Sequence, residues 1–137
     1  MLKKFLHIAF LVFASWLNVS KVMAAKHVKL YDTSCDVVYL FEYGVAKCGS
    51  AYDGHSYDCS PKNCRDGNKN YSVLVDCTHN GSTDQTTSQQ DCAQYTYTND
   101  DKNPTLNCIN TKGYHYTCPY NKNKGKKIEC KGCFMVP

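Results

Sequence analysis

The sequence CDVVYLFEYGVAKC (residues 35–48) begins, and CKGC (residues 130–133) ends, a ladder of ten cysteines that constrains how this chain folds. Ten cysteines in a chain of 137 residues are typical of a disulfide framework, which forms only in an oxidising compartment. We therefore expect all ten to be paired in structural disulfides, namely Cys35, Cys48, Cys59, Cys64, Cys77, Cys92, Cys108, Cys118, Cys130 and Cys133.

The N-terminus has the features of a secretory signal peptide. Two lysines precede an apolar run (residues 5–17), and small residues then offer a cleavage site after Ala24. The apolar run is shorter than the ~20 residues that span a bilayer. We expect residues 1–24 to be a signal peptide and residues 25–137 to form one secreted, extracellular domain, monomeric and without a membrane anchor.

Aliphatic residues are scarce in the expected mature segment. Residues 25–137 contain only fifteen Leu, Ile, Val and Phe residues, a fraction at which a chain without cross-links is expected to be disordered. All eleven tyrosines lie in this segment and supply large, half-polar packing surfaces. Five disulfides would add ~2–4 kcal/mol each. Removal of the leader lowers the formal charge from +4 to +1, so basicity gives no reason to expect a nucleic-acid partner.

Strand signals outnumber helix signals along the chain. Residues 49–70 are typical of a loop that Lys47-Cys48 opens and that Cys59 and Cys64 tie down, and Ser82 is placed to cap a short helix over residues 82–94. The remaining apolar or alternating segments favour strands, over residues 25–34, 36–45, 71–76, 94–98, 106–109, 114–118 and 127–136. The sequence therefore predicts a small, mainly β, disulfide-rich domain, an antiparallel sheet or sandwich of short strands with at most one short helix. A small α+β disulfide-rich domain is the alternative.

The motif Cys130-Lys-Gly-Cys133 has three interpretations. Redox catalysis needs a helix N-terminus at the first cysteine, whereas the flanking residues favour a strand. A zinc site would need further ligands, for which the candidates are Cys59, Cys64, His79 and His115. Behind a signal peptide we expect structural disulfides instead, with the two cysteines bonded to different partners, and no metal or cofactor. Spacing leaves the connectivity open.

A secreted ribonuclease is the enzyme class that the residues permit. It would need a general acid, a general base and a phosphate-binding cation, for which Glu42, His55 and His115 with Lys112 or Lys126 are available. No local motif supports this assignment, and the serine-hydrolase, zinc-protease and phosphate-loop motifs are absent from the sequence. We expect the protein not to be an enzyme.

Tyrosines in polar stretches are candidates for molecular recognition. We expect Tyr95 and Tyr97 to pack in the core. The expected binding residues are three tyrosines and the lysines that follow them: Tyr114, Tyr116, Tyr120, Lys122, Lys124, Lys126 and Lys127. The lysines either form a plain solvated face or bind an acidic partner. Asn70-Tyr-Ser72 and Asn80-Gly-Ser82 are candidate N-glycosylation sites at Asn70 and Asn80.

A short leader, a small domain, an even set of cysteines and the absence of a catalytic motif resemble the small secreted cysteine-rich effectors of plant-pathogenic fungi, rust fungi in particular. The resemblance is one of architecture. It implies a virulence effector that binds a host protein or a cell-wall carbohydrate and suppresses or evades defence. The alternatives are a secreted protease or glycosidase inhibitor or toxin-like protein, acting through an exposed loop between Cys48 and Cys77, and then a small ribonuclease or hydrolase.

Overall fold

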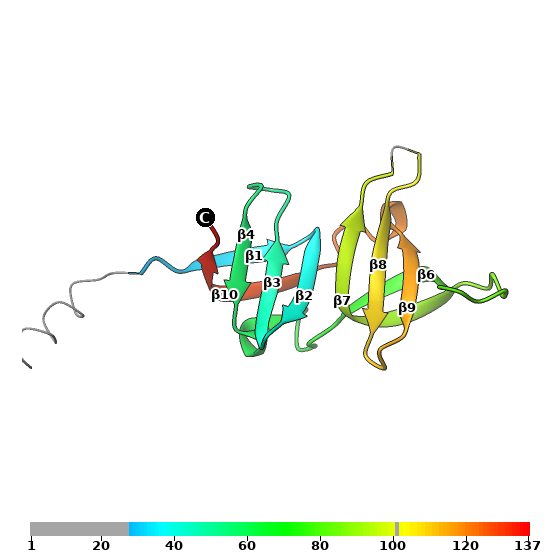
Figure 1. Cartoon of the computed structure of the whole chain (residues 1–137), viewed down its shortest axis with the longest axis horizontal. Coiled ribbons are helices and arrows are strands. Elements are labelled where there is room, and N and C mark those ends of the chain that lie inside the picture. Colours follow the sequence, from blue (N-terminus) through cyan, green and yellow to red (C-terminus); the bar gives the residue numbers. More distant parts are fainter. Residues whose placement is uncertain (1–27, 101) are drawn as a thin grey trace, which may run out of the picture.

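The computed structural model describes residues 28–100 and 102–137, and the expected signal peptide lies outside these residues. The described residues form antiparallel strands and two single 3-10 turns, Pro61–Asn63 and Tyr120–Lys122, with no α-helix among them (Figure 1). The strands are β1 (Tyr31–Cys35), β2 (Val38–Glu42), β3 (Val45–Gly49), β4 (Ser56–Cys59), β5 (Cys64–Arg65), β6 (Ser72–His79), β7 (Ser88–Thr98), β8 (Thr105–Asn110), β9 (His115–Pro119) and β10 (Ile128–Met135). The prediction of a small, mainly β, disulfide-rich protein is confirmed.

The strands form two lobes side by side (Figure 1). The first lobe contains β1 to β5 and β10, and the second contains β6 to β9. The chain therefore builds most of the first lobe, crosses to the second through residues 66–71, and returns through residues 120–127 to add β10. The second lobe is in effect an insertion between β5 and β10.

The four strands of the second lobe close into a ring. β7 pairs with β6 through its first half, where Gln90 lies opposite Leu74, and with β8 through its second half, where Tyr97 lies opposite Leu106. β9 pairs with both β8 and β6, which closes the circuit. A closed ring has no free strand edge, so its interior side chains are enclosed on all sides and open only at its two ends.

The five disulfides divide between the lobes. The first lobe holds Cys35–Cys48, Cys59–Cys133 and Cys64–Cys130, and the second holds Cys77–Cys118 and Cys92–Cys108. No cysteine is free, and each is at most 3% exposed. The two cysteines of Cys130-Lys-Gly-Cys133 are bonded to different partners, as expected, and none of the disulfides joins one lobe to the other.

Tyr95 joins the lobes through its hydroxyl. Its backbone on β7 pairs with Tyr39 on β2, and the two rings lie 6.1 Å apart. The hydroxyl donates a hydrogen bond to the carbonyl of Cys35 and accepts one from the N–H of Ile128 at 2.9 Å. Cys35 and Ile128 lie opposite each other at the end of the β1–β10 ladder. A side chain of the second lobe thus completes the backbone pairing of the first.

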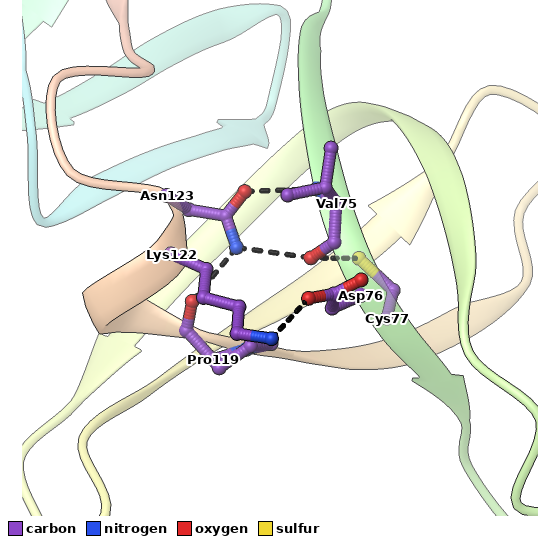
Figure 2. A network of polar contacts seen from close by, with 6 residues as sticks. All are labelled: Val75, Asp76, Cys77, Pro119, Lys122 and Asn123. Atoms are coloured by element: carbon purple, nitrogen blue, oxygen red, sulfur yellow. Dashed lines mark hydrogen bonds and ion pairs between the residues drawn. The ribbon is translucent and has the colours of Figure 1, made fainter.

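Asn123 secures the returning segment against the second lobe (Figure 2). β6 is irregular between Leu74 and Cys77, and Asp76 there has a φ of 58°. The Asn123 side chain accepts from the N–H of Val75 at 2.8 Å and donates to the carbonyls of Val75 and Pro119 at 3.1 and 2.7 Å. At the irregularity the backbone groups of Val75 lack partners on a neighbouring strand. The fully buried Asn123 amide supplies hydrogen bonds in their place.

The helix expected over residues 82–94 is wrong. Ser88–Thr98 is strand β7, and the preceding residues form a loop. In that loop Ser82 Oγ accepts from the N–H of Asp84 and Asp84 Oδ1 accepts from the N–H of Thr86, so both side chains stabilise turns rather than a helix start. Pairing with β6 on one side and β8 on the other overrides the weak helix signal.

Two boundaries expected in the first lobe are also wrong. The strand expected over residues 36–45 ends at Glu42, because Tyr43 and Gly44 form a tight turn with φ of 53° and 76° and reverse the chain into β3. Lys47 and Cys48 lie within β3 rather than opening a loop, and the loop expected over residues 49–70 contains β4, a 3-10 turn and β5.

The role of Tyr95 is tested by Tyr95→Phe, with Tyr97→Phe as control. Removing the Tyr95 hydroxyl leaves a buried carbonyl and a buried N–H without partners, which we expect to lower the free energy of unfolding by about 2–4 kcal/mol. The Tyr97 hydroxyl makes only an exposed 3.4 Å contact with Asn99, so its removal should change stability by less than about 0.5 kcal/mol. Denaturant unfolding measures both. Equal effects of the two substitutions would contradict the bridging role.

Three tyrosine hydroxyls should ionise above the ordinary pH range of tyrosine. Burial raises the pKa of Tyr39 to about 12 and that of Tyr95 further, and the hydrogen bond to Asp53 raises the pKa of Tyr57 to about 12. In the unfolded chain these hydroxyls ionise near pH 10, so their contribution to the free energy of unfolding should be constant below about pH 10 and fall as the pH rises further. NMR of the tyrosine ring resonances should show Tyr39, Tyr57 and Tyr95 still protonated at about pH 11. Ionisation of these three hydroxyls near pH 10 in the folded protein would refute this.

Candidate functional site

The open end of the second lobe forms a groove of about 390 Å³ beside the β8–β9 turn. Along each strand, alternate side chains face the same side. Gln90, Asn110 and Tyr116 each lie two residues from a buried half-cystine of their own strand, so they face the interior of the ring where it opens to solvent. We refer to this site as the barrel-mouth groove, and its lining residues are Gln89, Gln90, Asp91, Asn110, Thr111, Lys112, Tyr114 and Tyr116.

The Asn110 amide holds the groove in shape. Its Oδ1 accepts from the N–H groups of Lys112 and Tyr114 at 3.0 and 2.8 Å, and its Nδ2 donates to Oε1 of Gln90 at 2.9 Å. Gln90 in turn donates to the Ser88 hydroxyl at 2.8 Å. Asn110 is only 8% exposed. The turn that carries Tyr114 and the strand that carries Gln90 are therefore fixed relative to each other.

Three rings gather beside the groove. The His79 ring stacks on Tyr116 with 4.8 Å between centroids, and it meets the Tyr114 ring edge-on at 6.1 Å. Tyr116 is half-buried against the core, whereas Tyr114 is 56% exposed. Tyr114 thus presents its ring to solvent while the His79 ring contacts it edge-on.

The structure separates the binding residues expected from the sequence into two places. Tyr114 and Tyr116 lie at the barrel-mouth groove, before and at the start of β9, whereas Tyr120 lies beyond its other end. The two ends of this five-residue strand are roughly 14 Å apart, since a strand rises about 3.4 Å per residue. Tyr120 packs edge-on against Tyr97 at 4.9 Å and is partly buried against the core.

The lysines of the returning segment have different neighbours. Lys122 forms a 2.7 Å ion pair with Asp76, and this hydrogen bond raises the pKa of Lys122 (Figure 2). Lys124 lies 6.0 Å from the centroid of the Tyr120 ring. Lys126 is half-buried in the same segment, and Lys127 lines a depression on the first lobe. Their placement agrees better with separate local roles than with one basic patch.

That depression is larger than the barrel-mouth groove, at about 640 Å³, and it lies between β1, β10 and residues 50–53. Two of its carboxylates bond to backbone N–H groups of the fold. Asp32 accepts from the N–H of Gly132 at 3.0 Å, and Asp36 accepts from that of Ala51 at 2.8 Å. These contacts assign the two acids a structural role in fastening β1 to its neighbours.

The glycosylation candidates are both exposed. Asn70 lies in the segment that crosses between the lobes, and Asn80 lies at the turn after β6. Oδ1 of Asn80 accepts from the Thr117 hydroxyl at 2.6 Å, which leaves Nδ2 directed away from that bond. Asn80 alternates with His79 along the chain, so it faces away from the aromatic rings.

The structure does not bring the ribonuclease candidates together. Glu42 and His55 lie beyond opposite ends of the β3 strand that separates them, and His115 belongs to the other lobe. The segment from Cys48 to Cys77, expected as the exposed loop of an inhibitor, contains β4, β5 and most of β6, with turns and a 3-10 turn between them. The zinc candidates Cys59 and Cys64 are bonded to Cys133 and Cys130.

A scan against models of protein families found no match for this chain, and searches of curated proteins and of solved structures found none either. Among the described residues no helix is long and apolar enough to cross a membrane. The five disulfides are compatible with an extracellular protein.

Sequence reasoning identified Tyr114 and Tyr116 but missed the polar residues around them. Gln90 is 20 residues from its partner Asn110, and His79 lies on a different strand from both tyrosines. The Asn110-Thr-Lys-Gly113 turn was the available signal, since an Asn at the start of a turn often bonds to backbone groups that follow it. Which strands would face that turn depends on the ring closure, and no local pattern encodes it.

Proposed function

We propose that this protein is a secreted, disulfide-stapled binding protein that acts at a host surface as a virulence effector, and that it contacts its host target through the barrel-mouth groove. The observation that carries the proposal is the exposed Tyr114 ring above a prearranged set of polar side chains. Exposed tyrosines held on a rigid support give large contact area at a low cost in conformational entropy.

The support for a binding role is that Tyr114 does not belong to the core that stabilises the fold. The core consists mostly of half-cystines, together with Tyr39, Tyr57 and Tyr95. Each of these three tyrosines is at most 2% exposed. Tyr114 is outside this core, and the Asn110 network fixes its backbone. A rigid site loses little entropy on binding, so modest contacts suffice for recognition.

The proposal predicts that the mature protein, residues 25–137, suppresses a defence response of plant tissue when it is applied to leaf discs. Tyr114→Ala should weaken this activity at least about tenfold in dose, because truncating a central aromatic contact commonly costs 1–2 kcal/mol or more. The production of reactive oxygen after a defence elicitor measures the response.

The matched control is Tyr52→Ala. Tyr52 is 97% exposed on the first lobe, so its truncation removes an even more accessible ring outside the groove and should leave the dose response unchanged. Both variants should keep the thermal midpoint of the parent protein. Equal activity of the parent and the Tyr114→Ala protein would rule out the groove as the contact site, and no suppression by the parent would rule out the effector role.

A further inference from the structure

The lining of the barrel-mouth groove is close to electroneutral. Asp91 and Lys112 contribute one charge of each sign, and the other lining residues are amides, a threonine and two tyrosines. The remaining lysines of the C-terminal third lie elsewhere, with Lys122 paired to Asp76 and Lys127 on the first lobe. Selective binding of a polyanion needs an excess of positive charge, which this groove lacks.

The polar groups of the groove suit hydroxyl groups as partners. Amide side chains offer both donors and acceptors, and each hydroxyl of a ligand is likewise a donor and an acceptor. Gln89 is exposed at the rim, and Gln90 and Asn110 form a fixed pair at 2.9 Å. The groove therefore favours a ligand that carries many neutral hydroxyl or amide groups.

The aromatic side of the groove suits a flat ligand with an apolar face. His79 stacks on Tyr116 at 4.8 Å and supports Tyr114 edge-on, so the Tyr114 ring is exposed but held. A pyranose with equatorial hydroxyls has this dual character, because its axial C–H groups form an apolar face while its hydroxyls project around the rim. Its face can pack on Tyr114 while its rim reaches the amides.

The size and position of the groove agree with such a ligand. Its volume of about 390 Å³ falls within the range of roughly 300–1,000 Å³ that small-molecule sites occupy. Mouths of β-barrels are frequent locations for such sites. The groove is open at the end of the ring, so a chain of sugars can extend beyond it into solvent.

From these observations we propose that the barrel-mouth groove binds an uncharged oligosaccharide of pyranoses with equatorial hydroxyls, which stacks on Tyr114 and hydrogen-bonds to Gln89 and Gln90. This inference rests on the proposed function, in that it names the ligand class of the same groove. It assigns the host-facing contact to a neutral glycan rather than to a protein or an acidic polysaccharide.

The test is a titration of the disulfide-bonded mature protein with three probes, cellotetraose, chitotetraose and tetragalacturonate, followed by NMR and calorimetry. We expect at least one neutral tetrasaccharide to bind and to shift the resonances of Tyr114 and His79, and tetragalacturonate to bind at least about tenfold more weakly. Tyr114→Ala should weaken binding by about fivefold to tenfold, and Tyr114→Phe, which keeps the ring, by less than about twofold.

Two further variants separate this inference from alternatives. Lys112→Gln removes the only cation of the groove and should leave affinity for the neutral sugar within about twofold, and Tyr52→Ala should bind like the parent protein. A requirement for Lys112, or tighter binding of tetragalacturonate, would overturn the neutral-glycan assignment. So would the failure of both neutral sugars to bind at about 10 mM. If neither sugar binds while Tyr114→Ala still abolishes suppression of the defence response, the ligand is a protein, and the proposed function stands without this inference.

Discussion

The Tyr95 hydroxyl is the contact on which the arrangement of the two lobes depends. It lies between the carbonyl of Cys35 and the N–H of Ile128, where the β1–β10 ladder ends. Burial raises the pKa of this hydroxyl well above its ordinary value, so it remains a neutral donor and acceptor over the whole physiological range. One side chain thus couples the backbone of the first lobe to a strand of the second, in a protein in which no disulfide makes that connection.

The disulfides and the tyrosines perform different tasks. Each lobe is too small to bury much aliphatic surface. Its own disulfides stabilise it instead, because they restrict the conformations of the unfolded chain. The association of the lobes relies on noncovalent contacts. These are the Tyr95 hydroxyl, the β2–β7 pairing at Val38 and Tyr39, and the Asn123 amide on the returning segment. The contacts between the lobes do not involve the end of the second lobe at which the barrel-mouth groove lies.

The sequence predicted those parts of the fold that local chemistry determines. The cysteine content and the alternating segments predicted a disulfide-rich β protein. Asp53-Gly54 and Asn80-Gly81 are residue pairs typical of turns, and Gly54 and Gly81 do have φ of 72° and 77°. The hairpin at Tyr43 was missed because a tyrosine is an unusual residue at a positive φ in such a turn. The helix over residues 82–94 was wrong because pairing on both sides of β7 outweighs a weak local preference.

The sequence could not predict the features that depend on pairing between residues far apart in the chain. The disulfides Cys59–Cys133 and Cys64–Cys130 span 74 and 66 residues, and spacing alone does not distinguish them from other pairings. The sorting of all five disulfides into two lobes decides which side chains share a surface. For that reason Tyr114 and Tyr120, neighbours in sequence, lie at opposite ends of β9, while His79 and Gln90 lie close to Tyr114.

The division into two separately cross-linked lobes is tested most directly by digesting the unreduced protein with trypsin under denaturing conditions and weighing the disulfide-linked peptides. Trypsin can cut after Arg65 and Lys69 and again after Lys122, on both sides of the second lobe. We expect the peptides that contain Cys77, Cys92, Cys108 and Cys118 to be linked only to one another, and reduction to separate them. A disulfide between any of these four and a cysteine of residues 35–64 or 130–133 would contradict the two-lobe arrangement and, with it, the groove built on the closed ring.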